Sequence, residues 1–353
     1  MFLAIKEIKH EKLRYGLIVL MIFLISYLIF MLSSLAIGLS SQNTQAIESW
    51  NTQRVVLNKN SNINMNQSVL TKEDLKNFKM TKKDAVVGEL GIVAKTKGHQ
   101  SVSAQFLGIK KDQFIYKDQD LVAGKKAKKT NEVTVDSSFK DQGYHLGDKI
   151  SLNGSSKKYK IVGFVNNAKI NIAPIVYGRF ATWKKLRMAA PNVAASAVIS
   201  QNSKLDFNYK DAKTYSVEKF ISELPGYTAQ NMTFDLMIGF LFVISLIVIA
   251  VFLYILTMQK MHNFAVMRAQ GIPSKTLISA TISQSIILVV IGVIIGLILM
   301  WLTALLLPDA VPVKFTPLIA LGGTVGMLLM GIIGSLIPIR SILKVDPAKA
   351  IGE

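Results

Sequence analysis

The side chains that most often carry out enzymatic chemistry are few and scattered in this chain. Its four histidines are His10, His99, His145 and His262, and no two of them have the spacing of a metal site. There is no cysteine, which excludes thiolate catalysis, disulfides and cysteine-bound metal clusters. The sequence at 124–125, Gly-Lys, lacks the other residues of a phosphate-binding loop. Because no Ser, His and Asp residues are grouped by their context, we expect neither an enzyme nor a resident metal or cofactor.

Long apolar stretches without Asp, Glu, Lys or Arg are the elements on which any function must be built. Each exceeds the roughly 20 residues that cross a bilayer core of about 30 Å. The first stretch is too long, and its side chains too bulky, for a cleaved signal peptide, so we interpret it as a membrane anchor. The sequence therefore predicts an integral membrane protein. The four stretches are 15–47, 236–259, 276–308 and 315–339.

The predicted fold class is an α-helical membrane protein with four transmembrane helices in a 1 + 3 arrangement. A large extracellular α+β domain is inserted between helices 1 and 2. The expected segments are a cytoplasmic amphipathic helix at 1–14, transmembrane helices at 15–39, 235–259, 276–307 and 318–339, the extracellular domain at 40–234, a cytoplasmic coupling helix at 260–275, a short extracellular loop at 308–317 and a cytoplasmic tail at 340–353.

Basic residues predict the orientation of the spans. The N-terminal stub, the link between the second and third spans, and the C-terminal tail each carry three or four Lys or Arg. The link between the third and fourth spans carries only Lys314. Because short cytoplasmic loops are enriched in Lys and Arg, we expect both termini in the cytoplasm and the inserted domain outside the plasma membrane.

The net charge of +19 is concentrated in the inserted domain. Eleven of the 41 basic and six of the 22 acidic residues lie outside it, which leaves a balance of +14 within it. Such a surface suits membrane lipids, wall polymers or an acidic ligand, or it is simply a solvated lysine-rich surface. A nucleic-acid partner is not expected for a domain that faces outward.

Local patterns predict the elements of the inserted domain. Alternating apolar residues predict strands at 84–95 and 101–109. Thr71 and the acid three residues later resemble a capping box, which predicts a helix at 71–78. The Asn-Gly pair at 153–154 predicts a hairpin. The lysine-rich segment 119–130 is expected to be a loop.

The link between the second and third spans has the pattern of a capped amphipathic helix. Phe264, Val266 and Met267 are its apolar residues. Gly271 is expected to end the helix, and Ser274 to cap the next span. A rigid helix between two spans offers a soluble partner a means to move both of them. Alternatively, it merely lies on the membrane surface.

This link resembles the cytoplasmic coupling element of the MacB/FtsX-type (type VII) ABC-transporter permeases. The residues at 266–272 match the family pattern except at Gln270, where the family has an apolar residue. The tail at 344–351 is similar to the family's Pro-x-Glu-Ala-(Leu/Ile) ending, with Lys349 in place of Glu. The Gly-Asp…Val-x-Gly pattern within 147–163 is similar to a hairpin of the family's outer domain.

Within that family, the opening residues, the length and the ending most resemble the haem-exporter permeases of the HrtB type, with the DevC-like group close by. The resemblance implies a homodimer bound to two copies of a separately encoded ABC ATPase, which holds the ATP. The pair would expel haem or a similar amphiphile from the membrane by mechanotransmission. The alternatives are an exporter of antimicrobial peptides, drugs or lipids, and an FtsX-like relay that regulates a cell-wall hydrolase.

The resemblance also suggests where the substrate and the ATPase would bind. Haem is ligated by Met, Tyr, His or carboxylate groups, and such residues occur at the outer ends of the first two spans. Packing is the simpler explanation for each methionine, whereas an acid at the edge of a span is costly unless it is solvated or paired. The substrate candidates are Met31, Tyr227, Met232, Asp235 and Met237, and the ATPase-coupling candidates are His262, Phe264, Met267, Arg268 and Gly271.

Small residues in the spans predict close helix packing. Gly292 and Gly296 form such a pair in the third span. Ser34 and Gly38 form another in the first span, where we expect the first span of a second copy to pack. Ile25 points away from that pair at about 100° per residue, so we expect it to face lipid.

Overall fold

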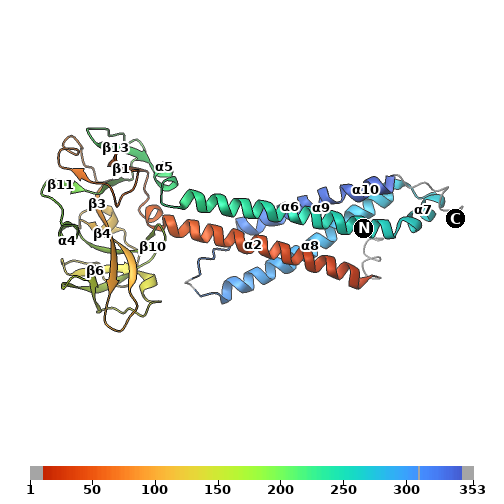
Figure 1. Cartoon of the computed structure of the whole chain (residues 1–353), viewed down its shortest axis with the longest axis horizontal. Helices are drawn as coiled ribbons and strands as arrows, with labels where there is room; N and C mark the ends of the chain where they lie inside the picture. Colours follow the sequence, from red (N-terminus) through yellow and green to blue (C-terminus); the bar gives the residue numbers. More distant parts are fainter. Residues whose placement is uncertain (1–10, 309–310, 344–353) are drawn as a thin grey trace. The chain divides into compact units, whose positions relative to one another are not determined.

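The computed structural model describes residues 11–308 and 311–343 of the chain. These residues form two compact units (Figure 1). The helical unit contains the described residues up to 38 and from 232 onwards, and the sheet domain contains residues 39–231. Most of the predicted amphipathic helix at 1–14 and of the tail at 340–353 lies outside the described residues, as does His10.

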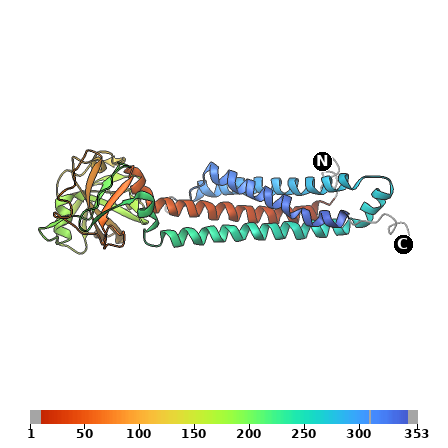
Figure 2. The ribbon, with the colours of Figure 1, turned by 90° about the horizontal axis from the view of Figure 1, so that it is seen from above.

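The described part of the chain contains four helices that are long and apolar enough to cross a membrane. One precedes most of the sheet domain in the sequence and three follow it, which confirms the predicted 1 + 3 arrangement. Both views show them running alongside one another (Figures 1 and 2). The four are α2 (Lys12–Ser49), α6 (Tyr227–Gln259), α8 (Ser274–Leu306), and α9 (Pro317–Gly334) together with α10 (Leu336–Leu343). The short helix α7 (Met261–Ala269) lies between α6 and α8 in the sequence.

The helix boundaries differ from the predicted spans in two ways. The first two long helices exceed them, because α2 continues to Ser49 and α6 already begins at Tyr227. The last span is interrupted at Ser335, between α9 and α10. Pro338 lacks the amide that would bond to the carbonyl four residues earlier, so an unbroken helix is disfavoured there.

Glycines on α8 allow α2 to pack closely against it, as predicted. A Cβ atom added to Gly292 would lie 2.7 Å from the Cγ2 atom of Ile22. One added to Gly296 would lie 2.5 Å from the Oγ atom of Ser26. These distances leave no room for a side chain, so the two glycines are the residues that bring the helices together.

The predicted packing partner of the small residues Ser34 and Gly38 was wrong. A Cβ atom on Gly38 would lie 1.8 Å from the carbonyl oxygen of Pro312, and the amide of Lys314 donates to the carbonyl oxygen of Ser34 at 3.1 Å. The segment before α9 therefore occupies this surface, where we expected a helix of a second copy. Ile25 does not face lipid either, since it is only 8% exposed and packs in the core of the helical unit.

The sheet domain is built on one large mixed sheet. Its strand order is β13-β1-β12-β3-β4-β10-β6-β8-β5, with β7 beside β3 and β8, and β9 beside β10. Only β4–β10 and β6–β8 pair in parallel. The strands of this sheet are β1 (Arg54–Asn58), β3 (Asp84–Lys95), β4 (Val102–Ile109), β5 (Leu121–Gly124), β6 (Glu132–Asp136), β7 (Lys149–Leu152), β8 (Lys158–Val165), β9 (Lys169–Ile170), β10 (Ala173–Arg179), β12 (Ala197–Ser200) and β13 (Ala212–Ser216).

The remaining elements of the sheet domain are short. A two-stranded sheet pairs β2 with β11. The presence of helices beside the sheets agrees with the predicted α+β class. These elements are β2 (Leu70–Thr71), β11 (Val193–Ala195), α3 (Phe114–Lys117), the 3-10 helix η1 (Ser137–Phe139), α4 (Phe180–Leu186) and α5 (Val217–Ser222).

Two hydrophobic cores lie on the two faces of the large sheet. Successive residues of a strand point to opposite faces, and the neighbours Phe106 and Leu107 of β4 belong to different cores. Trp183 of α4 is fully buried against β3 and β4, where it leaves no space for a Cβ atom at Gly88 or Gly108. These glycines therefore allow α4 to lie directly on the sheet.

Local patterns in this domain were interpreted with mixed success. The predicted strand 84–95 is β3, and the hairpin between β7 and β8 turns at Asn153 and the glycine after it, both with positive φ. The predicted helix 71–78 is wrong, because β2 is followed by turns. The bonds of the capping box do form, since the Asp74 carboxylate accepts from the Thr71 amide at 2.8 Å. The lysine-rich segment 119–130 was expected to be a loop, but it contains β5.

Candidate functional site

The short helix α7, between α6 and α8, ends in a tight turn. The amide of Ile272 donates to the carbonyl of Met267 at 3.1 Å, and the amide of Gly271 donates to that of Arg268 at 3.0 Å. This pair of bonds is the Schellman motif, which requires a residue with positive φ, and Gly271 has φ +89°. Gly271 therefore ends α7 as predicted. Ser274 is the first residue of α8 and makes no side-chain cap, so that prediction was wrong.

One face of α7 is packed against two neighbouring helices. Phe264 is 5% exposed and forms a small hydrophobic cluster with Leu277 of α8 and Ile342 of α10. Met267 and Ile272 pack at the edge of this cluster. Because the turn at Gly271 brings Ile272 back onto Met267, the cap and the cluster support each other. The link is thus attached to α8 and α10 through side chains as well as to α6 and α8 through the backbone.

The other face of α7 is open. His262 and Ala269 are exposed, and Val266 is 38% exposed. These positions are four and three residues apart, which places them on one side of the helix. Arg268 is half-buried. The predicted coupling residues therefore divide into two groups: Phe264 and Met267 attach the helix, while His262 lies on the exposed face.

The beginning of α2 is bonded to the junction of α6 and α7. The Nζ atom of Lys260 donates to the hydroxyl of Tyr15 at 2.7 Å and lies 5.2 Å from the centre of its ring. Arg14 donates to the side-chain oxygen of Gln259 at 2.9 Å. The sequence analysis missed this contact, because the partners are 245 residues apart and no local pattern relates them.

The structure separates the substrate candidates into three environments. Met232 and Asp235 are exposed on α6, three residues apart and therefore on one face of the helix, while Met237 is half-buried. Met31 is half-buried against the core of the helical unit. Tyr227 belongs to the sheet domain, where its hydroxyl lies 3.0 Å from that of Ser40. Of the five candidates, Met232 and Asp235 alone share an exposed face of one helix.

Three residues of the sheet domain come close enough to be considered as a metal site. Ligand atoms of His99, His145 and Asp148 lie within 4.8 Å of one another, although their spacing did not indicate this. However, the two ring nitrogens of His99 lie 2.8 Å from the Gly143 carbonyl and 3.3 Å from the Lys97 carbonyl. Asp148 accepts the His145 amide at 2.8 Å. A metal would have to displace these bonds, so the cluster is better explained as the link between two loops.

The C-terminal spans match a known family. Residues 236–347, which include α7, α8 and α9, match the FtsX-like permease C-terminal family. The C-terminal part of this chain is an FtsX-like permease domain. The resemblance noted at the coupling helix is thereby confirmed. A permease domain is not itself an enzyme, which agrees with the prediction.

The whole chain also aligns with individual proteins. It is 28% identical over 356 residues to a Staphylococcus epidermidis protein named hemin transport system permease protein HrtB, covering 100% of this chain and 99% of that one. A Staphylococcus haemolyticus protein of the same name is 27% identical over 366 residues, again covering 100% of this chain and 99% of that one. The periplasmic region of MacB from Actinobacillus actinomycetemcomitans aligns in structure with a TM-score of 0.36 and 12% identity, over 48% of this chain and 90% of that one.

Proposed function

We propose that this chain is the permease subunit of an ATP-driven ABC exporter, which moves haem or a similar amphiphile out of the membrane. Two copies of the permease would work with two copies of a separate ATPase. The observation that carries this proposal is the structure of α7. One face of this helix is attached to the spans, and the other remains open for a partner.

Force applied to α7 has a direct route into each span of the helical unit. The cluster around Phe264 connects α7 to α8 and α10. The backbone at Lys260 connects it to α6, and the bond from Lys260 to Tyr15 reaches the beginning of α2. An ATPase that binds the exposed side of α7 at Val266 would therefore move these helices together, without a continuous pore.

The choice of substrate has two supports. The Staphylococcus relatives are named for hemin transport and align over their full length with this chain. Met232 and Asp235 place a thioether and a carboxylate on one exposed face of α6, and both groups ligate haem iron in proteins. An exposed face on an apolar helix also suits a ligand that enters from the membrane.

The orientation follows from the position of α7. An ATPase works in the cytoplasm, so α7 would lie there together with both ends of the chain, and the sheet domain would lie outside the cell. The described residues around α7 include Lys260, Arg268 and Lys275, which agrees with the enrichment of basic residues in cytoplasmic links.

The test is ATP-dependent loss of haemin from proteoliposomes that contain the permease and the ABC ATPase that co-purifies with it. Val266→Asp puts a charge on the open face of α7, so we expect the ATPase to dissociate and export to fall at least tenfold. Phe264→Ala leaves that face intact but removes packing worth about 3–5 kcal/mol. We expect this variant to retain the ATPase and its hydrolysis but to lose export.

Val122→Asp is the matched control for the charge at α7. Val122 is 44% exposed in the sheet domain, close to the 38% of Val266, so it receives the same charge at a similar exposure. We expect this control to keep both the ATPase and export. Full export by both Val266→Asp and Phe264→Ala would refute the proposal that α7 transmits the force.

A further inference from the structure

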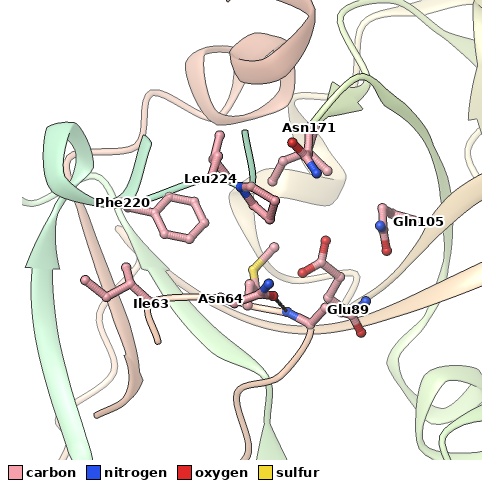
Figure 3. Close-up of a pocket in the computed structure, with 11 residues that line it drawn as sticks. Ile63, Asn64, Glu89, Gln105, Asn171, Phe220 and Leu224 are labelled. Atoms are coloured by element: carbon pink, nitrogen blue, oxygen red, sulfur yellow. Dashed lines mark hydrogen bonds between the residues drawn. The ribbon is translucent and has the colours of Figure 1, made fainter. Parts of the chain in front are cut away.

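The sheet domain contains a cavity of about 170 Å³ that the proposed transport function does not use. Its wall is divided by chemistry. Asn64, Asn66, Gln105 and Asn171 contribute amide groups. Phe220 and Leu224 contribute apolar surface (Figure 3). At about 30 Å³ per water molecule, the cavity has room for roughly six non-hydrogen atoms. Its size therefore suits a small organic group.

Glu89 of β3 is held so that its side chain points into this cavity. Its amide donates to the Ser196 hydroxyl at 3.0 Å, and its carbonyl accepts from both Trp183 and Arg187 at 3.0 Å. These bonds fix the backbone without using the carboxylate. Figure 3 shows the two carboxylate oxygens directed toward the middle of the cavity.

The Glu89 carboxylate is nevertheless buried. The residue is 5% exposed, and within residues 11–308 and 311–343 the carboxylate has no hydrogen-bond or ion-pair partner. Burial raises its pKa to about 7, and the nearby charge of Arg187 lowers this value only in part. An ionised carboxylate in such a place is costly unless a cation or hydrogen-bond donors pair with it. A cation bound in the cavity would therefore stabilise the ionised form of this carboxylate.

Two amide groups beside Glu89 are also available. The Oε1 atom of Gln105 is buried and has no hydrogen-bond partner in the described structure. Asn171 uses its backbone amide to bond to the Asn43 carbonyl, which leaves its side chain for the cavity. Together with Glu89, these side chains offer three acceptors. An ammonium group has three N–H donors to match them.

We propose that this cavity binds a primary alkylammonium group. The ammonium pairs with Glu89 and with the amide oxygens of Gln105 and Asn171, and the alkyl chain lies against Phe220 and Leu224. An inorganic cation would satisfy the carboxylate but would leave the apolar wall without a partner. The group belongs either to a small free amine or to the lysine side chain of a peptide. This site is independent of the proposed export function.

The test is calorimetric titration of the full-length chain in detergent with n-butylammonium chloride at pH 8. We expect saturable binding of one ligand per chain. Glu89→Gln should weaken it at least tenfold, and Gln105→Met should weaken it several-fold. The control, Glu73→Gln, makes the same change at an exposed glutamate on the surface of the sheet domain and should bind as the unaltered chain does.

The pH dependence gives a second readout. Among the described residues, Glu89 is the only titratable one that lines the cavity, and Arg187, which directly follows α4, is the charged group that affects it. For a carboxyl group with a pKa of about 7, the ionised fraction rises about tenfold between pH 6 and pH 8. We therefore expect affinity for n-butylammonium to rise about tenfold over this range, and this dependence to vanish in Glu89→Gln.

A second ligand distinguishes the two sources of the ammonium group. It is lysine whose α-amino and α-carboxyl groups are blocked and whose side-chain ammonium is free. Binding as tight as that of n-butylammonium would assign the cavity to peptide side chains. Binding of n-butylammonium alone would assign it to free amines. The proposal is overturned if potassium chloride binds equally well, if neither amine binds, or if Glu89→Gln binds as the unaltered chain does. A thermal unfolding transition in each variant verifies that it is folded.

Discussion

The buried carboxylate of Glu89 makes the stability of the sheet domain depend on pH, and Glu89→Gln should remove that dependence. Burial raises the pKa of this group from 4.5 to about 7, so the folded domain keeps a proton that the unfolded chain releases between these values. The contribution of this group to the free energy of unfolding is therefore fully present below about pH 4.5. It is lost as the pH rises from there to about pH 7.

The size of the effect follows from the same shift. A difference of about 2.5 pKa units, at about 1.4 kcal/mol per unit, corresponds to a loss of about 3 kcal/mol above pH 7. For a domain of 150–250 residues, each kcal/mol changes the Tm by roughly 2–4 °C. The unfolded carboxyl is already mostly ionised at pH 5, so part of this loss occurs below that pH. Between pH 5 and pH 8, the Tm of the unaltered domain should therefore fall by roughly 5–10 °C relative to that of Glu89→Gln.

Tryptophan fluorescence during heating is a suitable assay. Trp50 and Trp183 lie in the sheet domain, and Trp183 donates to the carbonyl of Glu89. A Trp301→Phe background removes the tryptophan of α8, so the signal reports on the sheet domain. Glu73→Gln is again the control, since its exposed carboxylate should leave the pH dependence unchanged. If the Tm of the unaltered chain and that of Glu89→Gln differ equally at pH 5 and pH 8, the carboxylate is not buried as described.

Two further predictions concern the substrate and the orientation. Met232→Ala combined with Asp235→Asn should weaken haemin binding at least tenfold in nanodiscs, as measured by the shift in haem absorbance. Met188→Ala, at a methionine that is 91% exposed in the sheet domain, should have no effect, and equal binding by all variants would exclude the α6 face as the site. In this cysteine-free chain, a cysteine at Ser137 should react with an impermeant maleimide on intact cells, whereas one at Ser274 should not; the reverse pattern would contradict the proposed orientation.

Features that depend on neighbouring residues could be predicted from the sequence. The four spans follow from length and the absence of charge, because each apolar residue contributes separately to the cost of leaving the membrane. The end of α7 at Gly271 follows from a backbone conformation that glycine adopts without strain. Strand β3 follows from the alternation of apolar and polar residues along 84–95, because successive side chains of a strand point to opposite faces of the sheet.

Features that depend on contacts between distant segments could not be predicted. The small residues Ser34 and Gly38 indicated a close approach, but spacing does not say whether a helix or the segment at 311–314 fills the space. Phe264 was recognised as apolar, yet its partners Leu277 and Ile342 come from two other helices. In both cases the sequence showed that a residue packs, and only the structure showed against what.

The sequence by itself determined that this is a four-span membrane protein with a capped helix between its second and third spans. Only the tertiary structure decided that this helix is attached to α8 and α10, and that Glu89 faces a cavity with Gln105 and Asn171. The physical reason is the range of the forces involved. Hydropathy and backbone preferences act within a few residues, whereas burial and the pairing of a charge depend on which remote segments the fold brings together.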